Sequence, residues 1–130
     1  MSWIRVGLAV LLVAHGVAHL PGSLGAWRLA TFPELPYHTT LLAGRLDVGD
    51  GGMRMMGVLW LAATAAFTAA AAGALLGRDW WAALAVVAAV GSLALCALEW
   101  PATRIGLAVN VVILGAVLAG QRGGWMVATR

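Results

Sequence analysis

The chain has 130 residues, of which 62% are hydrophobic and 10% are charged, and its formal net charge is +3. A soluble domain carries roughly a quarter charged residues. This composition, with a mean hydropathy of +0.92, therefore excludes an ordinary soluble domain and predicts an integral membrane protein. The eight basic residues are single arginines spread along the chain. That spacing excludes nucleic acid as a partner and makes the lipid bilayer the expected one.

Four apolar runs predict four membrane-spanning helices at about residues 3–20, 55–76, 80–98 and 105–120, with a long ordered loop over 21–54. Pro21 follows the first run, a Gly-Arg-Asp turn separates the second from the third, and Pro101 precedes the fourth. Helices satisfy their own backbone hydrogen bonds in lipid, and the chain has no spare strands for a barrel. We therefore expect an all-α fold, with residues 1–130 forming one four-helix membrane bundle.

Alternation of direction predicts the orientation of this bundle. It places the loop 21–54 and the segment after the third helix on one face, and both termini on the other. Each face carries four arginines, which is a tie under the positive-inside rule. The face of the termini has the shorter segments and the α-amino group, so it is the better cytoplasmic face. We expect a multi-pass cell-membrane protein with cytoplasmic termini and the loop 21–54 outside.

Two histidines, His15 and His19, lie one helical turn apart near the end of the first run. Ionisable groups are costly inside a membrane, so the pair indicates a functional site. The spacing would let both rings chelate one transition metal. A haem would take only one of them and would need its second ligand from the loop or another subunit. General acid–base chemistry is a third use. The structural alternative is that His19 caps the helix end while His15 bonds Asn110 or a carbonyl group.

Each of the other three runs also carries polar residues at helical spacing: Trp60, Thr64 and Thr68; Ser92, Cys96 and Glu99; and Asn110. At about 1.5 Å per residue, His15 and Asn110 lie at similar depth below the same face. We therefore expect a polar pocket at the outward end of the bundle. Its candidate catalytic residues are His15, His19 and Glu99, and its candidate ligand-binding residues include Asn110 and Trp60. Alternatively, the hydroxyl groups bond back to their own helices and Asn110 cross-links two helices.

The long loop supplies further candidates for the same pocket. Two prolines, a tyrosine and a glycine-rich charged run predict a shaped connection. As a lid, it would bring Arg45, Asp47, Asp50 or His38 to the ligand. As a purely structural cap, it would be held by Arg45 or Arg54 paired with an aspartate.

The first half of the chain has four features in a fixed order. They are an arginine near the start of the first helix, His15-Gly16 late in it, Leu35-Pro36 in the loop, and a second helix that starts near 52–57. The first half of the chain resembles the DoxX-like family of small four-helix membrane proteins. The resemblance implies a four-helix membrane fold and a link to quinone-dependent oxidoreductase subunits, and it assigns no catalytic residue.

Three functions follow from these patterns. The favoured one is a small membrane binding module or subunit that holds a metal, haem, quinone or lipid-like ligand in the pocket. The second is a membrane enzyme that uses His15, His19 and Glu99 on a lipophilic substrate, and the third is an oligomeric transport component. The cofactor is left open between a transition metal and haem, and a homo-oligomer or larger membrane complex is left open as the assembly.

Overall fold

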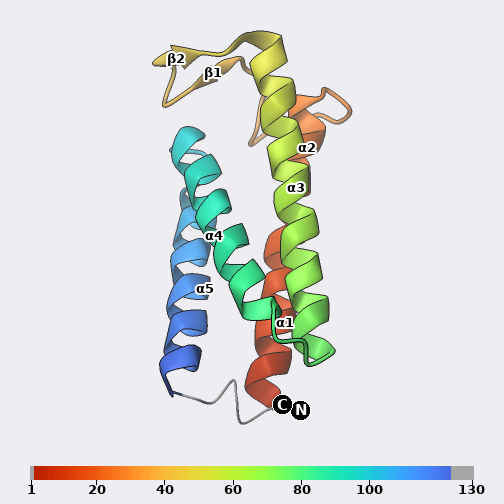
Figure 1. The fold of residues 1–130 in the computed structure, drawn as a ribbon. Helices are drawn as coiled ribbons and strands as arrows, with labels where there is room; N and C mark the ends of the chain where they lie inside the picture. The colour runs from red at the N-terminus through yellow and green to blue at the C-terminus, as the bar shows by residue number, and fades with distance from the viewer. Residues whose placement is uncertain (1, 124–130) are drawn as a thin grey trace.

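A computed structural model describes residues 2–123 of the chain, and helices make up most of it (Figure 1). Its helices are α1 (Trp3–Val17), α2 (Leu20–Ala26), α3 (Gly49–Leu75), α4 (Trp81–Leu98) and α5 (Arg104–Gly123). Two short strands, β1 (Thr40–Leu41) and β2 (Leu46–Asp47), pair antiparallel between α2 and α3. Within the described residues, four helical stretches are long and apolar enough to cross a membrane, with α1 and α2 forming one of them.

The first helical stretch does not end at Pro21, as the sequence predicted. The backbone makes a tight turn in which the His19 N–H donates to the Gly16 carbonyl, and α2 then continues to Ala26. Pro21 lies in the first turn of α2, where the N–H that proline lacks has no helical partner in any case. The proline thus begins a second helical segment, and the predicted loop loses its first six residues to it.

The second prediction that needs correction is the start of the helix after the loop. It was expected at residue 55, and α3 begins at Gly49. The Asp47 carboxylate accepts a hydrogen bond from the Gly49 N–H at 3.0 Å, and Asp50 lies in the first turn, where a negative charge favours a helix. Gly52 is required there, because a Cβ atom would lie 2.4 Å from Cβ of Val48. The glycine-rich run therefore belongs to the helix.

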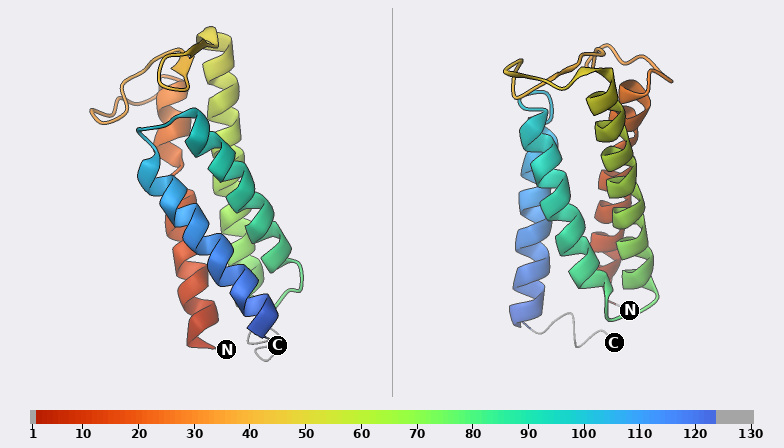
Figure 2. Two further views of the ribbon diagram at one scale, coloured as in Figure 1. Left: turned by 90° about the vertical axis from the view of Figure 1, so that its left-hand side faces the viewer. Right: turned by 45° about the horizontal axis from the view of Figure 1, so that its top comes forward.

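The helices pack in sequence: α1 and α2 lie on α3, α3 lies on α4, and α4 lies on α5. By contrast, α1 and α5 contact each other over only a few residues (Figure 2). We call this loosely packed side of the bundle, between α1 and α5, the seam. Two glycines of α3 allow close packing contacts within the bundle. The Trp27 indole ring packs against Gly57, and Trp80 and Trp81 pack against Gly73.

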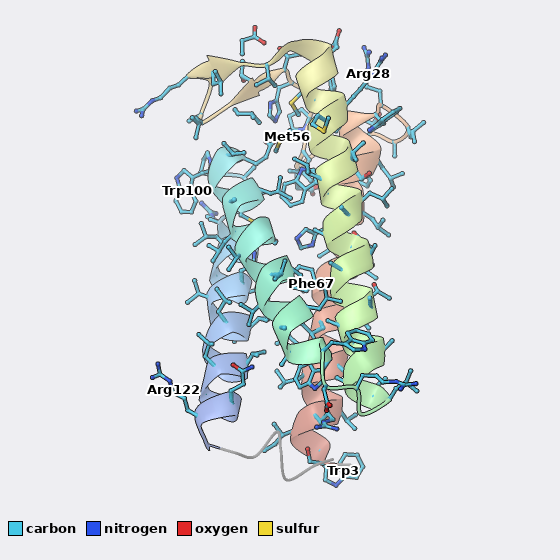
Figure 3. The ribbon with its side chains drawn as sticks, in the orientation of Figure 1. Trp3, Arg28, Met56, Phe67, Trp100 and Arg122 are labelled. Atoms are coloured by element: carbon cyan, nitrogen blue, oxygen red, sulfur yellow. The ribbon has the colours of Figure 1, made fainter. Side chains whose placement is uncertain are left out.

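The two ends of the bundle differ in character. Figure 3 places Trp3 and Arg122 at one end, Arg28 and Trp100 at the other, and Phe67 between them. Below Phe67 the core is sealed by apolar side chains without exposed surface, including Leu12, Ile113 and Val117. Above it, the β1–β2 ribbon and its flanking loop cover the end of the bundle (Figure 1). The Leu42 N–H donates to the Leu98 carbonyl at 2.7 Å and ties this cover to α4.

Candidate functional site

A cavity of about 330 Å³ lies under this cover, between α1, α2, α3, α4 and α5. Most of its wall is apolar, from residues such as Pro21, Leu35, Met53 and Ile105. Its polar groups come from both ends of the site: His15 and His19 below, and Tyr37, His38 and Glu99 above. The cavity runs from His15, which is 6% exposed, to His38, whose side chain is 42% exposed. A volume of this size is within the range of small-molecule sites.

A closed set of hydrogen bonds forms the lower end of the cavity. His15 Nε2 donates to Asn110 Oδ1 at 2.9 Å, and Asn110 Nδ2 donates to Ser92 Oγ at 2.8 Å. Ser92 Oγ lies 2.5 Å from His19 Nε2, and His19 Nδ1 lies 2.6 Å from the backbone carbonyl of His15. The set begins at the ring of His15 and ends at its carbonyl group.

One assignment of protons satisfies all four contacts. The amide of Asn110 fixes the direction, because its nitrogen can only donate and its oxygen can only accept. His15 then carries its proton on Nε2, Ser92 donates to His19 Nε2, and His19 donates from Nδ1. Both rings are neutral in this assignment. Of the four imidazole nitrogens of His15 and His19, it leaves only Nδ1 of His15 without a hydrogen-bond partner among residues 2–123.

Aromatic rings hold the two imidazoles in place. The Phe67 ring lies edge-on to His15, with centroids 5.0 Å apart, and 5.4 Å from His19. Trp60 lies 5.2 Å from His19 on the cavity side. Gly22 of α2 allows this arrangement, because a Cβ atom at that position would lie 3.0 Å from the Trp60 ring. The break between α1 and α2 therefore positions both His19 and the indole ring that lines the cavity.

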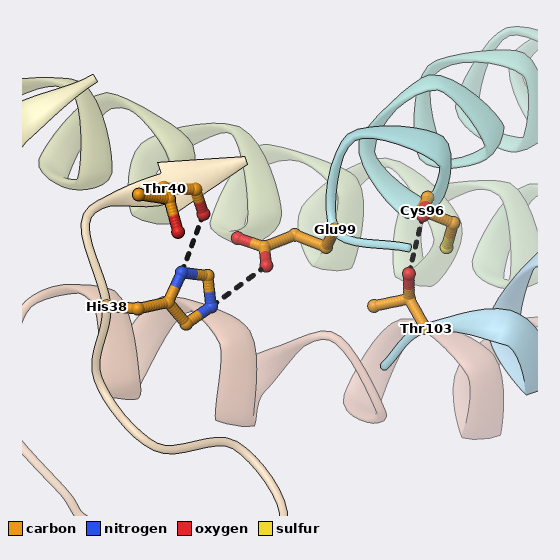
Figure 4. Close-up of polar contacts among 5 residues, drawn as sticks. All are labelled: His38, Thr40, Cys96, Glu99 and Thr103. Carbon is orange, nitrogen blue, oxygen red and sulfur yellow. Dashed lines mark hydrogen bonds and ion pairs between the residues drawn. The ribbon is translucent and has the colours of Figure 1, made fainter. Parts of the chain in front are cut away.

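An ion pair lies at the upper end of the cavity (Figure 4). His38 Nε2 is 3.2 Å from Glu99 Oε2, and His38 Nδ1 is 2.7 Å from the Thr40 carbonyl oxygen. The Glu99 side chain is only 11% exposed. This burial raises the pKa of Glu99 above its ordinary value, and the nearby His38 opposes that rise. The pair connects the loop to the end of α4.

Cys96 and Thr103 complete the wall next to α5. The Thr103 hydroxyl donates to the Cys96 carbonyl at 2.5 Å, which connects the last turn of α4 to the start of α5 (Figure 4). Gly106 of α5 leaves room for the Cys96 sulfur, since a Cβ atom there would lie 3.2 Å from it. Cys96 thus acts as a small buried wall residue.

The structure brings together some of the predicted site residues and separates others. His15, His19, Trp60, Glu99 and His38 line the cavity, and Asn110 supports it from behind. Glu99 pairs with His38, and no hydrogen bond joins it to His15 or His19. Thr68 bonds to a carbonyl group of its own helix, as the packing alternative predicted. Thr64 bonds to its own helix and also to the Gly16 carbonyl of α1, whereas Ser92 bonds to His19 and Asn110.

Three loop residues predicted to bind the ligand, Arg45, Asp47 and Asp50, do not line the cavity. Asp47 caps α3, and Asp50 accepts a hydrogen bond from the Tyr37 hydroxyl, which raises the pKa of Tyr37. Arg45 is exposed, and within residues 2–123 it forms no ion pair with either aspartate. The loop instead contributes Leu35, Pro36 and Tyr37, which the sequence analysis did not select. The Leu-Pro step and the single tyrosine of the loop were the available signals.

The side chains of the described residues do not form a ready metal site. No group of three His, Cys, Asp or Glu side chains is close enough to hold a metal ion within residues 2–123. Both ring nitrogens of His19 and Nε2 of His15 are engaged in protein hydrogen bonds. Coordination by His19 would break one of these bonds. The donor set therefore does not fit a preformed chelate between the two histidines.

Comparisons with protein-family models, curated proteins and solved structures find no match to this chain. The resemblance to the DoxX-like family stays a prediction from the first half of the sequence.

Proposed function

We propose that this chain is a small integral membrane protein that binds an amphipathic organic molecule in the cavity beneath its loop. The observation that carries the proposal is the cavity itself. It has about 330 Å³ of space, largely apolar walls, and polar groups gathered at defined points. This combination is typical of sites in which apolar contacts supply affinity and a few polar groups fix orientation.

The composition supports the membrane part of this proposal. Four helical stretches within the described residues have mean hydropathies of 1.6 to 2.3 over a span-length window. Tryptophans lie near both ends of the bundle, as Trp3 and Trp100 illustrate (Figure 3). We propose the same orientation as before, with the termini in the cytoplasm and the cavity near the outer face.

The hydrogen-bond pattern favours a binding protein over an enzyme that uses both histidines. A general base needs a nitrogen that is free to take a proton from the substrate. His19 has neither nitrogen free, because one contacts a backbone carbonyl and the other contacts Ser92. The sealed core below Phe67 likewise favours a binding site over a transport path, since it offers no polar groups between the cavity and the opposite end of the described helices except near Arg5.

Substitution of Ala18, which lines the cavity, tests the proposal. Ala18→Phe should fill part of the space and expel the bound molecule. Ala14→Phe is the matched control, because Ala14 is exposed one turn earlier on the same helix. We would purify all three proteins from membranes in mild detergent and compare their bound small molecules by native mass spectrometry. The wild type and Ala14→Phe should carry the same molecule at near one per chain, and Ala18→Phe should lose most of it.

Two outcomes would overturn the proposal. One is an equal content of small molecules in all three folded proteins, which would locate any bound molecule outside the cavity. The other is the absence of a bound organic molecule from the wild type under conditions that retain annular lipid.

A further inference from the structure

A groove on the loose side of the bundle lies next to the cavity. This groove follows the seam between α1 and α5 and is lined by Leu11, Arg104, Ile105, Ala108, Val109 and Val112. Ile105 and Val109 line the cavity as well as the groove. Along this seam α1 and α5 make far fewer contacts than α1 makes with α3 or α4 makes with α5. Apart from Arg104, the groove lining is apolar, so a hydrocarbon tail that extends from the cavity would lie against apolar side chains there.

The charges around the cavity restrict the head of that molecule. The cavity lining includes no arginine, and the sequence has no lysine. His38 already has Glu99 as its ionic partner. His15 and His19 are neutral in the proton assignment that satisfies their hydrogen bonds. A phosphate or carboxylate head would find no unpaired cation inside, and burying such a charge without a partner is costly. The cavity lining therefore favours an uncharged head, and Arg104 lies outside it, in the adjoining groove.

The hydrogen bonds restrict the head further. His15 is 6% exposed and lines the cavity, and its Nδ1 is an acceptor without a partner among residues 2–123. An acceptor at the wall of a largely apolar cavity is stabilised by a donor, and an uncharged donor on a small lipophilic molecule is most simply a hydroxyl group. The remaining wall around it is apolar, from residues such as Ala18 and Val109.

We infer that the ligand is a membrane-dissolved alcohol or phenol, with its hydroxyl group on His15 Nδ1 and its hydrocarbon tail in the α1–α5 seam. This inference rests on the proposed function and names the chemical class of its ligand. It also predicts the entry route, because the ligand would enter the cavity sideways from the bilayer, between α1 and α5.

Three probes that share one tail test the head chemistry: oleyl alcohol, oleyl methyl ether and oleyl phosphate. We would measure how each competes with a diazirine-bearing oleyl alcohol for photolabelling of the wild-type protein in liposomes. The ether keeps the size but loses the donor, and one neutral hydrogen bond corresponds to roughly a fivefold to tenfold change in affinity. We expect oleyl alcohol to compete about fivefold or more better than the ether, and oleyl phosphate to compete least.

A pair of tryptophan substitutions tests the route. Ala108→Trp fills the groove without lining the cavity, and Val111→Trp adds the same side chain to an exposed position of α5 outside the groove. In the wild type and Val111→Trp, the tail diazirine should label peptides from α1 and α5. In Ala108→Trp, this labelling should fall several-fold. Phenol, which has no tail, should protect the sole cysteine, Cys96, from N-ethylmaleimide equally in all three proteins.

The outcomes separate this inference from the proposed function. Equal competition by the three probes, or labelling that Ala108→Trp leaves unchanged, would overturn the inference while the cavity remains a binding site. Failure of every probe, together with no bound molecule in the wild type, would overturn both. Loss of labelling in Ala108→Trp with retained protection of Cys96 by phenol would support the route through the seam.

Discussion

The two halves of the bundle are built from the same helices, yet one is closed and the other contains a cavity. The side chains that α3 buries explain the difference. In the closed half they are small: Ala70, Ala71 and Ala74. In the half with the cavity they include three large ones, Met53, Met56 and Trp60, beside the small Gly57 and Ala63. Small residues let helix backbones approach closely, whereas bulky ones hold them apart.

A polar layer lies between the two halves. Phe67 forms the top of the closed half, and the rings of His15 and His19 rest on it. Asn110 and Ser92 bind these rings from α5 and α4. Side chains in this layer serve stability and the cavity at once, whereas those below it serve stability alone. Substitutions on either side of the layer should therefore separate stability from ligand binding.

The largest effect on stability is expected in the closed half. Leu12→Ala removes a side chain that has no exposed surface, so it should lower the free energy of unfolding by about 2–5 kcal/mol. Leu61→Ala is the matched control, because Leu61 is 53% exposed on the outside of α3. Denaturant titration in detergent micelles gives both values. Ligand binding by the folded fraction should not change, and a lost ligand in Leu12→Ala would contradict the separation of the two halves.

Substitutions in the polar layer should change both the free energy of unfolding and the affinity for the ligand. Asn110→Leu leaves His15 Nε2 without its partner and Ser92 Oγ with His19 alone, and a buried group left unpaired costs about 1–3 kcal/mol. It also frees the His15 ring to turn, so affinity for the cavity ligand should fall. Thr68→Val is the control, since it removes a hydroxyl that bonds only the Thr64 carbonyl of its own helix. Equal effects of the two variants would show that the layer has no special role.

The contrast between the halves was only partly predictable from the sequence. The four apolar runs identify the long helices because hydropathy is summed over some twenty residues and tolerates local errors. The depth argument from helical rise placed His15 and Asn110 level with each other, and the structure shows them hydrogen-bonded. Both inferences depend on regular helix geometry.

Helix ends and loop contacts depend on local competition, and there the sequence analysis was wrong. Pro21 was interpreted as a helix stop, although proline is equally suited to the first turn of α2. The glycine-rich run at 49–52 was assigned to the loop, although the Asp47 carboxylate accepts a hydrogen bond from the Gly49 N–H, where α3 begins. Which loop residue faces the cavity depends on the β1–β2 register, and that register could not be obtained from two-residue strands.

The smallest effect is expected at the upper end, where Glu99 joins the loop to α4. Burial raises the pKa of Glu99, so the folded protein holds this proton more tightly than the unfolded chain does. Between the ordinary carboxyl pKa of about 4.3 and the raised value, the folded state therefore binds more protons. The free energy of unfolding falls as pH rises through that interval. Glu99→Gln removes this titration, so the variant should gain stability relative to the wild type as pH rises.

Thermal midpoints measured in detergent between about pH 4 and pH 7 check this sign, because the interval begins near the ordinary carboxyl value. The difference between Glu99→Gln and wild type should grow with pH, whereas Glu34→Gln, at an exposed loop position, should leave the pH dependence unchanged. Leu12→Ala should shift the midpoint by the same amount at every pH, because the closed half around it holds no titrating carboxylate among the buried residues. A difference for Glu99→Gln that shrinks as pH rises would mean that the pair with His38 outweighs burial at this carboxylate. The upper end of the bundle would then be stabilised by the ion pair. The cavity proposal requires that apolar enclosure stabilises it.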